Sequence, residues 1–169
     1  MLSYQSGDTR AFESLYRRHK DGLFAFLYRG CQRQAIVEEL AQDTWMAVID
    51  AAGRYTPKAK FRTWLFQIAH NRSVDFWRRR DNQHGNLDDS PEIRSTEDQT
   101  NSLDHEVLRQ QLSEAIAALP EEQRTALLLQ EQGFSNEDIA DITSCGSETV
   151  KSRLRYARNQ LRNRLGGKP

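Results

Sequence analysis

Apolar side chains recur every three or four positions from residue 8 to residue 80, which is the spacing of amphipathic α-helices. Asp8 or Thr9 can cap the first of these helices. A second helix is expected over residues 35–52 and a third over residues 61–80, with a short break between the two. No segment alternates polar and apolar residues with a period of two, so the sequence predicts no strands.

Near the C-terminus the pattern changes to a short helix, a tight turn and a long basic helix. Ser135 is followed three positions later by Asp138, which resembles a capping box and predicts a short helix over residues 137–143. A turn containing Gly146 separates it from a helix over residues 148–165, which Ser147 can cap. This order is typical of a helix-turn-helix, which places its second helix in the major groove of DNA. A helical hairpin with a solvated basic face is the alternative.

Residues 81–102 contain few apolar side chains among many acidic and amide ones. Such a segment cannot bury enough surface to offset the entropy lost on ordering, so we expect a flexible acidic linker. The helical pattern resumes at about residue 103. The sequence therefore predicts an all-α protein with two small helical domains, residues 1–80 and residues 103–169, joined by this linker.

The formal net charge of zero hides a strong segregation of charge along the chain. Residues 1–80 hold 14 Lys and Arg against 8 Asp and Glu, residues 81–122 hold 2 against 11, and residues 123–169 hold 8 against 5. Two basic blocks thus flank an acidic segment. The basic blocks favour nucleic acid or another acidic partner.

In the expected helix over residues 61–80, one apolar stripe must face a core, and it consists of Phe61, Trp64, Leu65, Ile68 and Ala69. The other faces combine aromatic and cationic side chains, with Arg62, Arg72 and Trp77 among them. Aromatic rings beside guanidinium groups suit a surface that stacks on unpaired bases and neutralises phosphates. A buried amphipathic helix with a solvated basic end has the same composition, so this segment alone leaves both interpretations open.

Several other classes of function have no support in the sequence. Cys31 and Cys145 are too few for a disulfide framework and lack metal-site spacing, and the four histidines lie far apart. There is no phosphate-binding loop and no nucleophile motif. We therefore expect no catalytic residues, no metal and no cofactor. No apolar run approaches membrane-spanning length, so we expect a soluble, cytoplasmic protein that does not insert into membranes.

The motifs in this order resemble the extracytoplasmic-function branch of the sigma-70 family of bacterial RNA polymerase sigma factors. The matching stretches are GDTRAFESLYRRH at 7–19, EELAQDTWMAVIDA at 38–51, FRTWLFQIAHNRSVDFWRR at 61–79, ALPEEQRTALLL at 118–129, GFSNEDIADI at 133–142 and ETVKSRLRYARNQLR at 148–162. The first block looks like the family's region 2 and the second like its region 4. The combination is specific, whereas a helix-turn-helix alone is not.

The resemblance implies how the first block works. Its second helix resembles the family's main contact with the β′ clamp helices of core RNA polymerase, and the residues assigned to that contact are Glu38, Glu39, Gln42 and Asp43. The loop around residues 54–60 resembles the loop that captures a base flipped from the −10 element. The residues that the resemblance assigns to −10 DNA are Tyr55, Lys60, Arg62, Ile68, Asn71, Arg72, Trp77 and Arg78.

The last helix resembles the one that recognises the −35 element in the major groove. The residues that the resemblance assigns to it are Ser147, Thr149, Lys151, Ser152, Arg153, Arg155, Tyr156 and Arg158. The second block is also expected to contact the β flap of the polymerase. One departure from the family pattern is Ser144, which stands in the turn where glycine is usual. A left-handed backbone there would be less favourable.

The resemblance therefore implies an alternative sigma factor that binds core RNA polymerase, directs promoter-specific initiation and is controlled by an anti-sigma factor. The first alternative is a stand-alone helix-turn-helix transcriptional regulator, in which residues 1–80 serve dimerisation or effector binding. The second is a protein-interaction adaptor with basic faces. A sigma factor should bind promoters well only together with polymerase, whereas the regulator should bind specific DNA tightly by itself.

Overall fold

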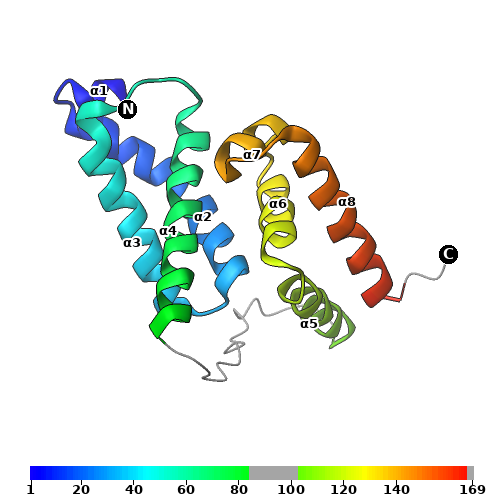
Figure 1. Cartoon of the computed structure of the whole chain (residues 1–169). Coiled ribbons are helices and arrows are strands. Elements are labelled where there is room, and N and C mark those ends of the chain that lie inside the picture. The colour runs from blue at the N-terminus through cyan, green and yellow to red at the C-terminus, as the bar shows by residue number, and fades with distance from the viewer. Residues whose placement is uncertain (84–102, 167–169) are drawn as a thin grey trace.

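The structure, a computed structural model, describes residues 1–83 and 103–166, and all regular elements in these two ranges are helices (Figure 1). They are α1 (Leu2–Gln5), α2 (Thr9–Cys31), α3 (Gln34–Ala51), the 3-10 helix η1 (Ala52–Arg54), α4 (Phe61–Gln83), α5 (Leu103–Ala117), α6 (Glu121–Glu131), α7 (Asn136–Thr143) and α8 (Ser147–Arg164). The all-α fold class is confirmed. The sequence did not predict α1, and α4 continues three residues beyond its expected end. The rest of the expected linker, from residue 84, lies outside the described residues.

Helices α2, α3 and α4 form the first helical unit, with α1 against one end (Figure 1). Its interior is apolar, and Leu23, Val37, Val48 and Leu65 have no exposed surface. The expected cap of the first helix is present, because the carboxylate of Asp8 accepts hydrogen bonds from the first backbone N–H groups of α2. Helices α5 to α8 form the second unit, whose fully buried side chains are Leu129, Ile139, Ile142, Val150 and Ala157.

The short helix α7 begins with the capping box that the sequence predicts. The hydroxyl of Ser135 accepts a hydrogen bond from the backbone N–H of Asp138, and the Asp138 carboxylate accepts one from the backbone N–H of Ser135. The helix ends at Ser144, whose φ of 52° lies in the left-handed region where glycine is the most comfortable residue. One expectation was wrong in detail: Gly146, not Ser147, is the N-cap of α8.

This difference between the two serines gives a matched pair of stability variants. We expect Ser135→Ala to lower the free energy of unfolding by about 1 kcal/mol, because an N-cap hydrogen bond is lost. Ser147→Ala should change it by less than about 0.5 kcal/mol, since Ser147 makes no side-chain cap bond. Urea denaturation measures both. Equal losses in the two variants would contradict the assignment of the cap.

The two helical units pack directly against each other along α4, which in Figure 1 lies between α3 and the α6–α7 pair. Leu65 and Ala69 of α4 are buried in the first unit, while Phe66 meets Phe134 of the second unit edge-on, with ring centroids 4.8 Å apart. As a result, no side chain from Phe61 to His70 is exposed. Helix α4 is therefore enclosed on both sides over its first turns.

Polar contacts also join the two units, and most of them lie near the turn between α6 and α7. Arg62 donates a hydrogen bond to the carbonyl of Gln132, and its guanidinium carbon lies 4.2 Å from the centroid of the Phe134 ring. Further contacts are Thr63 to Asp138 at 3.0 Å, Gln67 to the carbonyl of Asp141 at 3.1 Å, Arg29 to Glu131 at 2.6 Å and Gln32 to Ser113 at 2.8 Å. The contact between the units is thus both apolar and specifically hydrogen-bonded.

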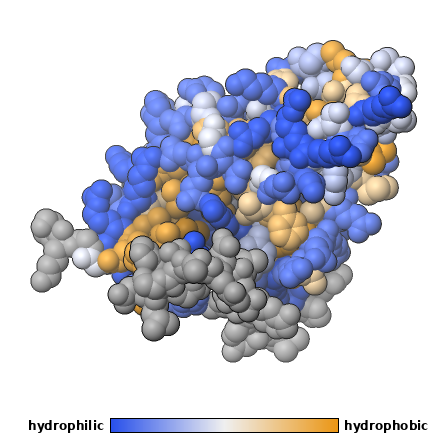
Figure 2. Space-filling model, turned by 180° about the vertical axis from the view of Figure 1, so that it is seen from behind, coloured by the Kyte–Doolittle hydropathy of each residue, from blue (hydrophilic) through white to orange (hydrophobic). Residues whose placement is uncertain are grey.

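The second unit leaves an apolar face uncovered where α5 lies beside the end of α8. Val107 and Leu108 are each 56% exposed, and Leu112 and Leu165 are also exposed. Figure 2 shows hydrophobic surface gathered at this end of the molecule, next to the residues drawn in grey. These side chains lie on the apolar sides of their helices, but the unit itself does not cover them.

Candidate nucleic-acid interface

Helix α3 presents one polar face to solvent. The four residues assigned there by resemblance, Glu38, Glu39, Gln42 and Asp43, are all exposed and lie on adjacent turns, because residues three or four apart share one side of a helix. Met46 continues this face by one more turn and is 52% exposed. Ile36, Val37 and Leu40 on the opposite side are buried in the first unit. The face can therefore contact another protein without disturbing the core.

The loop between η1 and α4 displays polar and cationic side chains, and Thr56 to Lys60 are all exposed. Tyr55 at its start behaves differently. It is only 9% exposed, and its ring lies 4.8 Å from that of Trp64 and 6.5 Å from that of Phe61. Burial also raises the pKa of the Tyr55 hydroxyl. Tyr55 thus supports the base of the loop from within, and a direct contact with DNA stays a prediction.

Further along α4, amide and cationic side chains reach solvent again. Asn71 and Arg72 are exposed there, and Ile68 is partly buried beside them. Arg78 is also exposed and forms an ion pair with Asp75 at 2.9 Å. These residues add amide and guanidinium donors to the first unit, and donors of this kind suit a nucleic-acid backbone.

Two residues assigned to −10 DNA lie on the other side of α4. Arg62 is held by Gln132 and Phe134, and Trp77 is partly buried and lines a small cavity that residues of both units surround. The sequence had placed both on a free face, because a single helix pattern cannot reveal a second unit that covers it. In this arrangement neither side chain reaches DNA, so their predicted contact requires the two units to separate.

The outer side of α8 carries the expected cationic surface. Lys151, Arg155 and Tyr156 are exposed there, with the guanidinium carbon of Arg155 5.2 Å from the centroid of the Tyr156 ring. Arg158 is also exposed, but it lies toward α6, where its guanidinium donates to the side-chain oxygen of Gln130 at 2.6 Å. The amine of Lys151 pairs with Glu148 at 2.6 Å, and this hydrogen bond raises the pKa of Lys151. Thr149 is exposed, whereas Ser147 and Ser152 are partly buried. The charged part of this face is the part that can reach into a groove.

Arg153 does not belong to this outer face. Its side chain is only 19% exposed, forms an ion pair with Glu122 at 2.8 Å, and donates to the sulfur of Cys145 at 3.4 Å. It therefore ties α8 to the start of α6 and to the turn before α8. The sequence interpretation placed Arg153 on the outer side. Its spacing from the buried Val150 and Leu154 puts it at the edge between the buried and the exposed side, so the pattern alone could not assign it to either. Its expected part in −35 recognition stays a prediction that its position does not favour.

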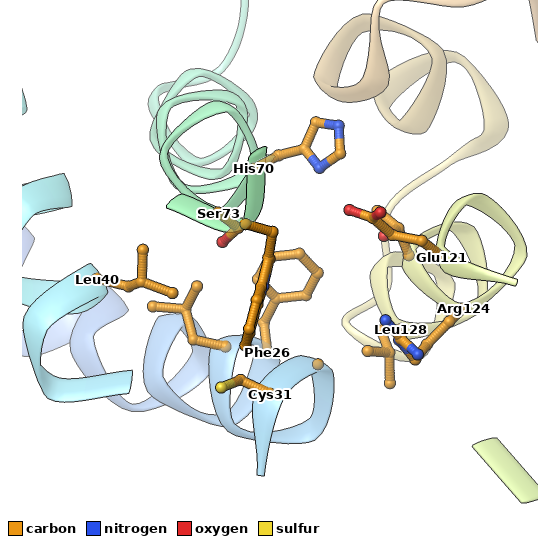
Figure 3. A pocket seen from close by; sticks show the side chains of 12 residues that line it. Phe26, Cys31, Leu40, His70, Ser73, Glu121, Arg124 and Leu128 are labelled. Atoms are coloured by element: carbon orange, nitrogen blue, oxygen red, sulfur yellow. The ribbon is translucent and has the colours of Figure 1, made fainter. Parts of the chain in front are cut away.

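A small cavity of about 40 Å³ lies between the two units and is lined by residues of α2, α3, α4 and α6. In Figure 3, His70 of α4 and Glu121 of α6 point toward this space, and Cys31 of α2 lies at its lower edge. Burial lowers the pKa of the His70 imidazole, and the nearby Arg153 guanidinium lowers it further. Burial also raises the pKa of the Cys31 thiol. Both groups are thus kept neutral near pH 7.

The lowered pKa of His70 predicts that acid weakens the fold. Between the ordinary histidine pKa of about 6.5 and the lower folded value, the unfolded chain binds a proton that the folded chain does not. We therefore expect the free energy of unfolding to fall as the pH drops from 7.5 to 5.5, and His70→Gln to reduce this fall. Urea denaturation at both pH values is the measurement. His19→Gln should also reduce this fall, because burial lowers the pKa of His19 as well, and the double variant should reduce it further. If the free energy of unfolding of His70→Gln falls as much between the two pH values as that of the wild type, the prediction is contradicted.

Within the two described ranges, no helix is long and apolar enough to cross a membrane. The same residues contain no group of three or more His, Cys, Asp or Glu side chains placed to hold a metal ion.

Comparison with known families and proteins found matches over both described parts of the chain. Residues 15–83 match the family described as sigma-70 region 2, and residues 109–161 match sigma-70, region 4. The chain is 30% identical to RNA polymerase sigma factor CarQ of Myxococcus xanthus over 98% of its own length and 95% of the relative. It is 29% identical to the ECF RNA polymerase sigma-E factor of Haemophilus influenzae, covering 95% of this chain and 90% of that one.

Among solved structures, the chain resembles the sigma factor RpoE in a complex with the anti-sigma factor NepR from Bartonella quintana. The TM-score is 0.81 and the identity 27%, over 95% of this chain and 100% of the other. CnrH, in a complex with the cytosolic domain of CnrY, has the same fold, with a TM-score of 0.75 at 22% identity over 99% of this chain and 96% of the other.

Proposed function

Because the chain belongs to the extracytoplasmic-function branch of the sigma-70 family, we propose that it binds core RNA polymerase in the cytoplasm and directs initiation at a defined set of promoters. We propose further that it has no catalytic activity of its own. The observation that supports this most is that two separate helical units, in the family's order, each expose a surface of amide and guanidinium donors.

The polymerase contacts are assigned to two faces that the fold leaves uncovered. The exposed acidic face of α3, from Glu38 to Met46, is proposed to meet the β′ clamp helices. The apolar face of α5 and the end of α8 is proposed to meet the β flap, since exposed apolar patches of this kind mark protein interfaces. Neither face is needed to hold the fold together.

The DNA contacts are divided between the two units. Lys151 and Arg155 on α8 are proposed to grip the −35 duplex through the major groove. The loop of residues 55–60, together with Asn71 of α4, is proposed to hold a base flipped from the −10 element. A polar pocket with aromatic support can offset the few kcal/mol that unstacking a base costs. Tyr55 belongs to that support.

Binding both promoter elements at once requires the two units to move apart. The −10 and −35 positions differ by about 25 base pairs, or roughly 85 Å at about 3.4 Å per base pair. A compact chain of this size has a radius of gyration of only about 15 Å. The packed arrangement is therefore proposed to be a closed state of the free protein, which core polymerase opens.

Regulation by an anti-sigma factor is proposed from the structural neighbour RpoE, which was solved with the anti-sigma factor NepR. That sigma factor shares 27% of its sequence with this chain, and the two folds correspond along nearly all of both. A partner that binds the closed state would keep the two units packed together, and the chain could then not bind both promoter elements.

Run-off transcription with purified core polymerase and a promoter library tests the proposal. We expect promoter-specific transcripts only when polymerase and this chain are both present. The double substitution Glu39→Lys and Asp43→Lys should reduce association with polymerase, while the same change at the exposed Glu13 and Asp21 of α2 serves as the charge-matched control. Tight, specific DNA binding by the chain alone would favour the stand-alone regulator. Failure to associate with core polymerase would contradict the proposed function.

A further inference from the structure

The short helix α1 supplies a hydrogen-bond donor to the loop that precedes α4. The side-chain amide of Gln5 donates to the carbonyl of Gly53 at 3.2 Å and to the carbonyl of Tyr55 at 3.3 Å. These contacts join residues about 50 positions apart in the sequence. Helix α1 lies before residue 15, where the match to region 2 begins. The donor is therefore a feature of this chain that the matched region does not include.

Helix α1 is itself fixed to the first unit. The Tyr4 ring lies 5.0 Å from the ring of Phe12 on α2, and Phe12 in turn meets Trp45 of α3 edge-on at 5.9 Å. A turn at Gly7, with a φ of 105°, connects α1 to the cap of α2, and such a backbone angle suits only glycine comfortably. The amide of Gln5 thus projects from a frame that packing holds in place.

The path of the loop of residues 56–60 is set by the residues at its start, because only these are anchored to the rest of the unit. Tyr55 is anchored by its buried ring and by its backbone N–H, which donates to the carbonyl of Ala52 at 3.2 Å. Beyond it, the side chains from Thr56 to Lys60 are exposed and pack on no core. If the Gln5 amide were absent, water would satisfy the carbonyls of Gly53 and Tyr55, and water does not fix a direction.

We propose that Gln5 is a positioning residue for base capture during promoter opening. By holding two carbonyl groups at the start of the loop, it keeps the loop in the arrangement that receives the flipped base, so less ordering remains to be done during binding. This inference rests on the proposed function of the loop. Gln5, which lies outside the region matched to the family, thus joins the residues proposed to act in opening the promoter duplex.

The test compares Gln5→Ala and Gln5→Glu with wild type in holoenzyme. The glutamate is nearly isosteric but cannot donate when ionised. We expect both variants to open duplex promoters about tenfold more slowly, since two hydrogen bonds are lost. Affinity for core polymerase should not change. Gln111→Ala, which removes an exposed glutamine of α5, is the control and should behave like wild type.

Abasic promoters separate positioning from a general structural role. If Gln5 acts through the captured base, removing that base from the −10 element should abolish most of the difference between Gln5→Ala and wild type, which is the non-additivity expected of coupled partners. In the isolated chain, trypsin should cleave after Lys58 or Lys60 several times faster in Gln5→Ala. Equal opening rates for wild type and both variants would overturn the inference, as would an undiminished difference on every abasic promoter. If wild type itself opens no promoter, the proposed function fails, and this inference fails with it.

Discussion

Replacing Lys151 and Arg155 together by alanine should lower transcription from −35-dependent promoters by roughly one hundredfold. Both side chains are exposed on the outer face of α8, and neither contributes to the buried side of that helix. Contacts of this kind with base edges and phosphates contribute about 1–3 kcal/mol each to recognition, and two moderate losses multiply to about that factor. The free energy of unfolding should change little, because no packing is lost.

The measurement is run-off transcription at one fixed salt concentration, since contacts with phosphates depend strongly on salt. The charge-matched control is Arg162→Ala with Arg164→Ala, which removes two exposed cations from the far end of the same helix. We expect the control to cost only a few-fold. If both double variants lose the same activity, α8 acts through its total charge and the proposed groove contact is wrong.

Substituting Thr63 by glutamate should separate the two helical units. Thr63 is only 2% exposed, and its hydroxyl donates to the Asp138 carboxylate at 3.0 Å. Burial alone raises the pKa of Asp138, but hydrogen bonds from Thr63 and Ser135 hold this pKa below its usual value, so the carboxyl is ionised near neutral pH. A second carboxylate against it would be buried beside a like charge, and a buried charge without a partner costs about 3–5 kcal/mol.

Small-angle scattering measures the separation. We expect Thr63→Glu to raise the radius of gyration clearly above the roughly 15 Å of a compact chain of this length. Thr63→Val is the control, because it keeps the shape and loses only one hydrogen bond, at a cost of about 1 kcal/mol. The valine variant should stay compact. An unchanged radius for the glutamate variant would show that the contacts along α4 outweigh this one.

The sequence predicted the helices well wherever local chemistry determines them. The capping box at Ser135 and the Asp8 cap are local signals, and both have the hydrogen bonds that the spacing implies. Helix α1 was missed because four residues are too few to show a period. Its evidence is the contact of Gln5 with a loop about 50 residues away, which no local pattern contains.

The packing between the units could not be predicted from the sequence. Phe66 was not assigned to the core, because the stripe of α4 that faces the first unit already accounted for its apolar residues. The structure buries Phe66 against Phe134 of the second unit, and it turns Arg62 away from the free surface for the same reason. A helix that packs on two sides has no single apolar face, so a one-face pattern describes only half of its contacts.

The enclosure of α4 from Phe61 to His70 has a consequence for how this protein can change over generations. A helix with one solvent face can accept many polar replacements there without loss. Here each of ten consecutive positions meets a neighbour, so almost every replacement must be matched by another in a different helix. Inherited variation should therefore accumulate slowly in this stretch and arise in pairs, with the second member of each pair in the helix it touches.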